Sequence, residues 1–125
     1  MEKRKILVVD DDVMITRFLK IVLEKTGRFS VCAENAGTHA LAAANEFRPD
    51  LIILDLNMPD VEGGVVASQL KAHEDLKDIP VLFLTGNVSE EEADAQITIG
   101  ENSVLAKPIN LEKLVDCIDK HLTKG

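Results

Sequence analysis

The sequence has no long apolar segment, and it is short of basic residues. The charged start Met1–Lys5 is followed by only four apolar residues before three aspartates, too few for a signal-peptide core or a membrane span. Lys and Arg number 14 against 22 Asp and Glu, which gives a net charge of -8. Because nucleic-acid phosphates require a basic surface, this balance argues against direct nucleic-acid binding. We therefore expect a cytoplasmic protein with neither a membrane nor a nucleic acid as partner.

Cysteine and histidine are scarce as well. The two cysteines, Cys32 and Cys117, lie in apolar periodic segments without Cys-x-x-Cys spacing, which predicts buried reduced thiols and argues against a disulfide or a zinc site. The three histidines, His39, His73 and His121, fall on separate predicted helices with no common ligand spacing. They are interpreted as surface residues, and none is a convincing phosphodonor.

The 125 residues, 46% of them hydrophobic, alternate between short apolar runs and segments of helical periodicity. Strands are predicted at 5–9, 29–33, 51–54, 79–84 and 104–106, and helices at 13–25, 36–47, 63–73, 89–99 and 111–122. No linker or repeat interrupts the alternation, so a single domain over 1–125 is expected. Five strands and five helices in this order predict an α/β fold, a flavodoxin-like doubly wound parallel sheet with strand order 2-1-3-4-5. Its ligand crevice would lie between the first and third strands.

Three helices carry specific start or stop signals. Gly27 closes the first helix as a C-cap, and Asn110 caps the last one. Ser89–Glu92 has capping-box spacing and predicts a fourth helix that runs to about Ile99, where Gly100 stops it. The apolar stripes of the first and last helices are predicted to face the core. Their members are Ile15, Phe18, Leu19, Val22 and Leu23, and Leu111, Leu114, Val115, Ile118 and Leu122.

The third predicted strand ends in an aspartate. Leu51–Leu54 is a run of four aliphatic residues between turn-forming residues, typical of a strand buried on both faces, and Asp55 follows it directly. Ligands of open parallel sheets bind at the carboxyl ends of the strands. Asp55 is therefore a candidate for chemistry, although alone it could simply end the strand and start a turn.

Other polar residues follow the neighbouring strands. Asp10 and Asp11 follow the first strand, Thr85 ends the fourth and Lys107 follows the fifth, so parallel strands would bring them to the same edge as Asp55. The carboxylates form an oxygen-rich pocket suited to Mg²⁺. Lys107 would neutralise phosphoryl oxygens, Thr85 would hydrogen-bond one of them, and Asp55 would be the nucleophile that forms an aspartyl phosphate.

Each of these residues also has a purely structural interpretation. Asp12 is well placed as N-cap of the first helix, and an acidic run at a helix start is favourable without a metal. Thr85 suits a strand end, Gly86 suits a turn, and Lys107 could be a solvated lysine. A common role is favoured because all of these residues fall at strand ends together.

The chain resembles the receiver domain of two-component response regulators, such as the bacterial chemotaxis regulator. The resemblance covers essentially the whole chain and includes the spacings between the motifs. The motifs are Val8-Val9-Asp10-Asp11, Leu54-Asp55-Leu56-Asn57-Met58-Pro59, Leu84-Thr85-Gly86 and Ala106-Lys107-Pro108. The resemblance implies that Asp55 accepts a phosphoryl group from a phosphohistidine of a sensor histidine kinase or histidine phosphotransfer protein. Such a domain catalyses its own phosphorylation and dephosphorylation but is not a turnover enzyme.

The resemblance also assigns the ligands. Asp11 and Asp55 would bind Mg²⁺ directly with the main-chain carbonyl of Asn57, and Asp10 would act mostly through a water. Thr85 and Lys107 would bind phosphoryl oxygens, and the Lys107–Pro108 bond is expected to be cis.

The same family docks its phosphodonor helices beside the site, where this chain has Met14, Ile15 and Ile109, each of which could instead belong to the core. A weak homodimer is a further candidate assembly. One position departs from the family pattern: the residue three before the lysine is usually Tyr, Phe or His, and here it is Val104. This leaves the output step open.

Two other functions would also use an aspartate in this position or this fold. A phosphatase of the haloacid dehalogenase type also uses an aspartate nucleophile, but it needs a second acid two residues later, where this chain has Asn57. A degenerate receiver that serves only as a binding module is disfavoured by the complete set of acids, threonine and lysine.

Overall fold

The computed structural model describes residues 3–86, 97–99, 102–106 and 109–122. These residues form six strands: β1 (Arg4–Val9), β2 (Phe29–Glu34), β3 (Leu51–Asp55), β4 (Val81–Thr85), β5 (Ile97–Ile99) and β6 (Asn102–Ala106). The described helices are α1 (Val13–Lys25), the 3₁₀ helix η1 (Gly37–His39), α2 (Ala40–Phe47), α3 (Gly63–Ala72) and α5 (Leu111–Leu122).

The strands form one sheet in the order β2-β1-β3-β4-β6-β5. Five of them, from β2 to β6 in this order, are parallel, which confirms the predicted doubly wound sheet and its 2-1-3-4-5 order. The sixth, β5, pairs antiparallel with β6 at the edge, and the prediction of a helix as far as Ile99 is wrong there. Ile97, Thr98 and Ile99 are all β-branched and fit a pleated strand better than a helix. The rest of that predicted helix, 89–96, lies outside the described residues.

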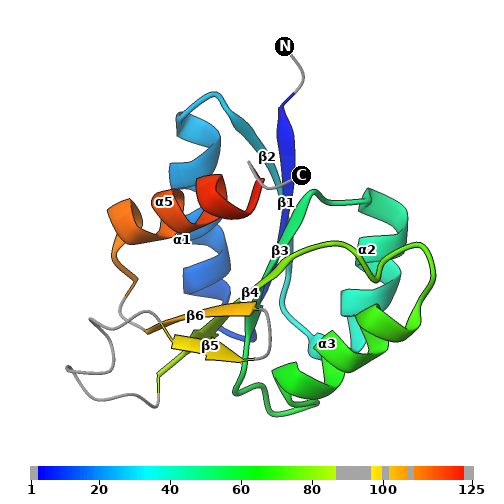
Figure 1. The fold of residues 1–125 in the computed structure, drawn as a ribbon. Coiled ribbons are helices and arrows are strands. Elements are labelled where there is room, and N and C mark those ends of the chain that lie inside the picture. Colours follow the sequence, from blue (N-terminus) through cyan, green and yellow to red (C-terminus); the bar gives the residue numbers. More distant parts are fainter. Residues whose placement is uncertain (1–2, 87–96, 100–101, 107–108, 123–125) are drawn as a thin grey trace.

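Helices cover both faces of the sheet. Figure 1 shows α1 and α5 on one face and α2 and α3 on the other. Two separate core clusters correspond to these two layers: Ile6, Val8, Leu51 and Ile53 belong to one, and alternate residues of the same strands belong to the other. Because both faces are buried, the central strands are continuous aliphatic runs instead of alternating ones.

Details of the helices differ from the sequence prediction in three places. The predicted helix at 36–47 begins as the 3₁₀ turn η1 before α2 starts at Ala40. Phe18 and Leu111 were expected in the core, but they are 49% and 38% exposed. The apolar stripes of α1 and α5 are wider than the surface that the sheet can cover, so their outer members face solvent. Asp12 and Asn110 cap α1 and α5 as predicted, and Gly27 has φ +77° just after the end of α1.

The outer edge of β2 is covered by side chains of α1. Lys20 Nζ donates to the Val31 carbonyl over 2.7 Å, and the Val31 amide donates to Glu24 Oε2 over 3.1 Å. These bonds satisfy backbone groups that an edge strand would otherwise present to another chain. Cys117 is buried, as predicted, whereas Cys32 on this strand is only half-buried, and the two cysteines form no disulfide in the described part of the chain. Burial, followed by Glu34, raises the pKa of the Cys32 thiol.

Candidate functional site

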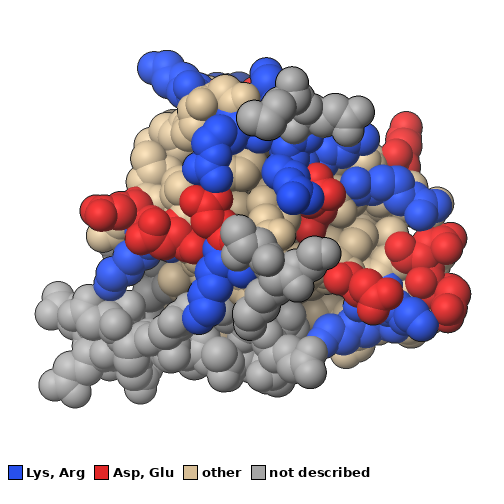
Figure 2. All heavy atoms as spheres, turned by 45° about the horizontal axis from the view of Figure 1, so that its top comes forward, with Lys and Arg blue, Asp and Glu red and all other residues tan. Residues whose placement is uncertain are grey.

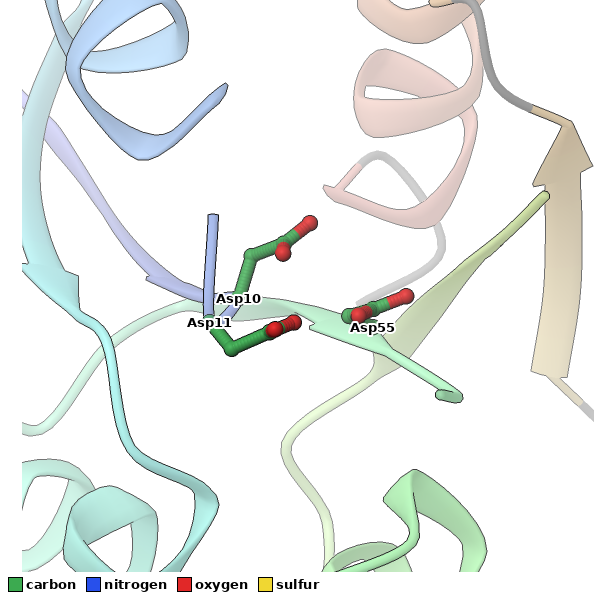
Figure 3. Close-up of side chains that lie close together, drawn as sticks. All are labelled: Asp10, Asp11 and Asp55. Carbon is green, nitrogen blue, oxygen red and sulfur yellow. The ribbon is translucent and has the colours of Figure 1, made fainter. Parts of the chain in front are cut away.

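The carboxyl ends of β1 and β3 bring three aspartates together. The strands are neighbours in the sheet, with Val9 opposite Leu54, so Asp10 and Asp11 emerge beside Asp55. A carboxylate oxygen of each residue lies within 4.8 Å of the others. Figure 3 shows Asp11 extending from the end of β1 towards Asp55. Asp10 and Asp55 are buried at 0% and 1% exposure, whereas Asp11 is exposed.

Helix capping explains only one residue of the acidic run. The Asp12 carboxylate accepts from the Met14 amide over 3.0 Å, as an N-cap does. Asp10 Oδ1 accepts from the Asp12 amide over 2.9 Å, which holds the turn between β1 and α1. Capping therefore accounts for Asp12, but it gives no reason to bury Asp10 next to Asp55.

The loop after Asp55 is closed by a glycine. Gly63, the first residue of α3, donates its amide to the Leu56 carbonyl over 3.1 Å. A Cβ atom on Gly63 would lie 2.4 Å from the Asp55 carbonyl oxygen and 2.8 Å from Leu56 Cα. Only glycine allows α3 to start this close to the strand end, so Gly63 helps to fix Asp55.

A second contact holds the far side of this loop. The Asp60 carboxylate accepts from the amides of Thr38 and Gly37 over 2.9 and 3.3 Å, and these bonds, above all that from Thr38, lower the Asp60 pKa. A Cβ atom on Gly37 would lie 2.5 Å from Val61 Cγ1 and 2.9 Å from Met58 Cε. Sequence reasoning missed Asp60 and Gly37, because no local pattern marks a contact between loops about 22 residues apart in the chain. It also missed Gly63, because the need for glycine there depends on how close α3 comes to Asp55.

Thr85 lies at the end of β4, next to β3, and is 6% exposed. The Asn57 side-chain amide donates to the Thr85 hydroxyl over 3.3 Å, so the two side chains lie next to each other at the carboxyl ends of β3 and β4. Lys107 and the Lys107–Pro108 bond lie outside the described residues. Val104 on β6 is 4% exposed and packs into the core cluster on the α2 and α3 face.

The acidic cluster fits a small divalent cation. Its three carboxylates are hard oxygen donors. Those of Asp10 and Asp55 are buried, and that of Asp11 is open to solvent. Two like charges about 5 Å apart repel by roughly 3 kcal/mol at an effective dielectric constant of 20. A bound cation would relieve this repulsion, which gives the cluster a physical reason to bind one.

An apolar surface borders the site. Val13, Met14, Phe18 and Ile21 on α1 are 51%, 71%, 49% and 52% exposed. Of the residues predicted to dock a partner, Met14 is therefore a surface residue, whereas Ile15 and Ile109 are partly buried against the core.

No helix in the described part of the chain is long and apolar enough to cross a membrane.

Comparison with known proteins finds similar sequences and similar folds. The family model of the response regulator receiver domain matches residues 6–119. The transcriptional regulatory protein PrrA of Mycobacterium tuberculosis is 38% identical over 111 residues, which are 89% of this chain and 46% of PrrA. The DNA-binding response regulator MtrA of Mycobacterium leprae is 34% identical over 98% of this chain and 53% of MtrA. The chain thus spans about half the length of these relatives.

Solved structures agree with this result. The chemotaxis protein CheY4 of Vibrio cholerae superposes with a TM-score of 0.83 at 31% sequence identity, covering 97% of this chain and 100% of CheY4.

Proposed function

Because this chain belongs to the receiver domain family of two-component response regulators, whose general function is phosphorylation on an aspartate, we propose that Asp55 is its phosphoacceptor. The observation that supports this choice is the position of Asp55 at the carboxyl end of β3, with oxygens of Asp10 and Asp11 within 4.8 Å. We take residues 1–125 as one receiver domain. Cys32 and Cys117 form no disulfide in the described part of the chain, which suits the reducing cytoplasm, where we propose that the protein acts.

The proposed reaction is a transfer between two side chains. A carboxylate oxygen of Asp55 attacks the phosphorus of a phosphohistidine, an O–P bond forms, and the N–P bond of the donor breaks. The imidazole leaves with the electron pair and takes up a proton. Thr85 donates a hydrogen bond to a phosphoryl oxygen, and Lys107 places a positive charge beside another. Later hydrolysis of the aspartyl phosphate, catalysed by the same domain, returns the free carboxylate without making the protein a turnover enzyme.

The acidic residues would hold Mg²⁺. We propose Asp11, Asp55 and the main-chain carbonyl of Asn57 as direct ligands, with Asp10 acting through a water. The ion supplies positive charge that offsets the charge on the phosphoryl oxygens. Asp10 contributes by adding negative potential from a buried position and by holding the turn through its bond to the Asp12 amide.

Receiver domains interact with sensor kinases or phosphotransfer proteins, and we propose that the phosphodonor docks on α1. Val13, Met14 and Phe18 are exposed apolar residues that begin directly after the acidic turn. A helical partner bound there would bury them and bring its histidine to Asp55. Met14→Ala should therefore slow transfer from the partner while leaving phosphorylation by a small donor unchanged.

Mass spectrometry after incubation with acetyl phosphate and Mg²⁺ tests the proposal. We expect one phosphoryl group per chain, lost in EDTA and lost in Asp55→Asn. Asp50→Asn is a matched control, because Asp50 precedes the other end of the same strand and pairs with Arg4. Labelling that survives Asp55→Asn would refute the assignment, and so would loss of labelling in Asp50→Asn alone.

The alternative phosphatase requires an acid at position 57. The Asn57 side chain is a carboxamide, which donates a hydrogen bond to Thr85 but is not acidic enough to protonate a leaving group at neutral pH. Repeated turnover of a small phosphomonoester would favour the phosphatase, and stoichiometric labelling favours the receiver. If the chain showed neither labelling nor Mg²⁺ dependence, a binding module would be the remaining function.

A further inference from the structure

One polar side chain outside the acidic cluster contacts the backbone that carries it. Asn35, the residue after β2, donates its amide to the Asp10 carbonyl oxygen over 3.0 Å. The same amide donates to the Thr16 hydroxyl on α1 over 2.8 Å. Thr16 is 2% exposed, and its hydroxyl in turn donates to the Val13 carbonyl over 3.1 Å. Asn35 thus connects the end of β2, the acidic turn and the first turns of α1.

The hydrogen bond from Asn35 to Asp10 continues the hydrogen bonding between β1 and β2 beyond their last paired residues. The Asp10 amide donates to the Glu34 carbonyl over 3.1 Å, close to where the pairing of β1 with β2 ends. Asn35 then supplies, from its side chain, a donor for the Asp10 carbonyl. That carbonyl belongs to the peptide unit between Asp10 and Asp11. Its orientation therefore determines where both carboxylates point.

The geometry points to Asn35 as a positioning residue for the cation site: its amide fixes the Asp10–Asp11 peptide so that the carboxylates stay together against their mutual repulsion. This inference rests on the proposed function, because it takes the acidic cluster as the Mg²⁺ site. Groups that hold metal ligands in place typically change metal affinity by about 10- to 100-fold when they are removed. Because Asn35 is itself exposed to solvent, we expect a loss of Mg²⁺ affinity at the lower end of this range.

Magnesium titrations by calorimetry test the inference on the intact chain. We expect Asn35→Ala to weaken Mg²⁺ binding about tenfold. Asn45→Ala is the matched control, because Asn45 also uses its side chain in a hydrogen bond, to Arg48, but lies on α2. Its Mg²⁺ affinity should equal that of the wild type. Unchanged affinity in Asn35→Ala, or an equal loss in both variants, would overturn the inference.

Thr16 provides a second pair of variants in case Asn35→Ala folds poorly. Thr16→Val removes the hydroxyl that Asn35 binds and should weaken Mg²⁺ binding in the same direction but by less. Thr16→Ser keeps the hydroxyl and should restore wild-type affinity. Equal affinities for the valine and serine variants would contradict the proposed connection.

Hydrogen exchange in EDTA separates this inference from the proposed function. The Asp12 amide donates to Asp10 Oδ1, so it reports on the acidic turn without any metal. Its exchange should be faster in Asn35→Ala and unchanged in Asn45→Ala. If the wild type bound no Mg²⁺ but exchange at Asp12 were still faster in Asn35→Ala alone, the proposed function would fail while the positioning role of Asn35 stood. Unchanged exchange at Asp12 would refute the role itself.

Discussion

The two ends of the central sheet use their acidic residues in opposite ways. At the carboxyl end, Asp10, Asp11 and Asp55 are grouped with one another. At the amino end, acidic residues face basic ones, and Figure 2 shows Lys and Arg interspersed with Asp and Glu on that side. The ion pairs there are Arg4–Asp50, Arg28–Asp119, Arg48–Asp75 and Lys77–Glu74.

This difference separates structural charges from functional ones. The pairs at the amino end are exposed, and such pairs contribute about 0–1 kcal/mol each. The cluster at the carboxyl end places like charges close together, and we expect a bound cation to lower the cost of their repulsion. Proteins keep such arrangements where activity requires them. The sign of the effect of neutralising an acid should therefore reveal which of the two roles it has.

The largest expected effect comes from adding the cation. At a Mg²⁺ concentration about 100 times its dissociation constant, the free energy of unfolding of the wild type should rise by about 2.7 kcal/mol. Asp11→Asn, which lacks one ligand, should respond much less, and Asp50→Asn should respond like the wild type. Urea melts with Mg²⁺ and with EDTA measure this. An equal response of all three proteins would place the cation elsewhere.

Alanine substitutions of Gly63 and Gly64 test whether the close packing of α3 against Asp55 matters. In Gly63→Ala the new methyl group meets the backbone of Asp55, so we expect a loss of about 2 kcal/mol, within the usual range for overpacking, together with weaker phosphorylation. Gly64 has no atom within 4 Å of its Cβ position, and Gly64→Ala should stabilise α3 by about 0.5 kcal/mol. Denaturant melts and acetyl phosphate labelling of both variants check this. Equal effects would show that the close approach at Gly63 is unimportant.

At the amino end a single substitution should cost less. Arg28 pairs with Asp119 and lies 4.9 Å from the centroid of the Phe29 ring. Because this pair is about half exposed, Arg28→Ala should lower the free energy of unfolding by less than about 1 kcal/mol and leave Mg²⁺ binding unchanged. Arg28→Lys keeps the charge and should recover part of the loss. A change in Mg²⁺ affinity would mean that the two ends are coupled.

Val104 should limit how far a structural change caused by phosphorylation of Asp55 spreads into β5 and β6. Its two methyl groups could not fill the space that Thr85 would leave if it turned to a phosphoryl group on Asp55, as an aromatic ring could. We therefore expect only small amide shift changes along β5 and β6 when beryllofluoride mimics the phosphoryl group. Large changes there would show that a non-aromatic switch works.

The smallest expected effect is the change with pH in the contribution of Asp60 to the free energy of unfolding. Its folded-state pKa is lowered by the bonds from Thr38 and Gly37, so its contribution to stability is present above the unfolded pKa of about 3.9 and is lost as the pH falls through the folded value. Asp60→Asn should therefore be less stable than the wild type at pH 7, and the difference should shrink below about pH 4. Unfolding measurements from pH 2.5 to 7 test this. A difference independent of pH would assign the effect to packing.

The sequence predicted most of the sheet because its signals there are local. Runs such as Leu51–Leu54 identify buried strands, and parallel alignment then brings the residues after them to one edge. The prediction failed at Ile97–Ile99, where a helix-start signal at Ser89–Glu92 outweighed three β-branched residues. It also placed Phe18 in the core, because periodicity shows the direction of a stripe but not how much of it a neighbour covers.

The supporting residues of the site could not be predicted in this way. Asn35 reaches Asp10 across 25 residues, and Asp60 reaches Thr38 across 22. Both contacts join a side chain to the backbone of a distant loop, so neither leaves a spacing in the sequence. The requirement for glycine at position 63 likewise depends on how close α3 comes to Asp55.

The most direct test compares one acid from each end of the sheet in EDTA. Asp11→Asn, and likewise Asp55→Asn, should raise the free energy of unfolding by on the order of 1 kcal/mol, because each removes a like charge from the cluster. Asp50→Asn should lower it by about 1 kcal/mol, because Asp50 accepts from the Lys5 amide over 2.8 Å and pairs with Arg4. Opposite signs are the predicted result. If all three substitutions destabilised the protein, the aspartates at the carboxyl end would be structural caps and not a cation site.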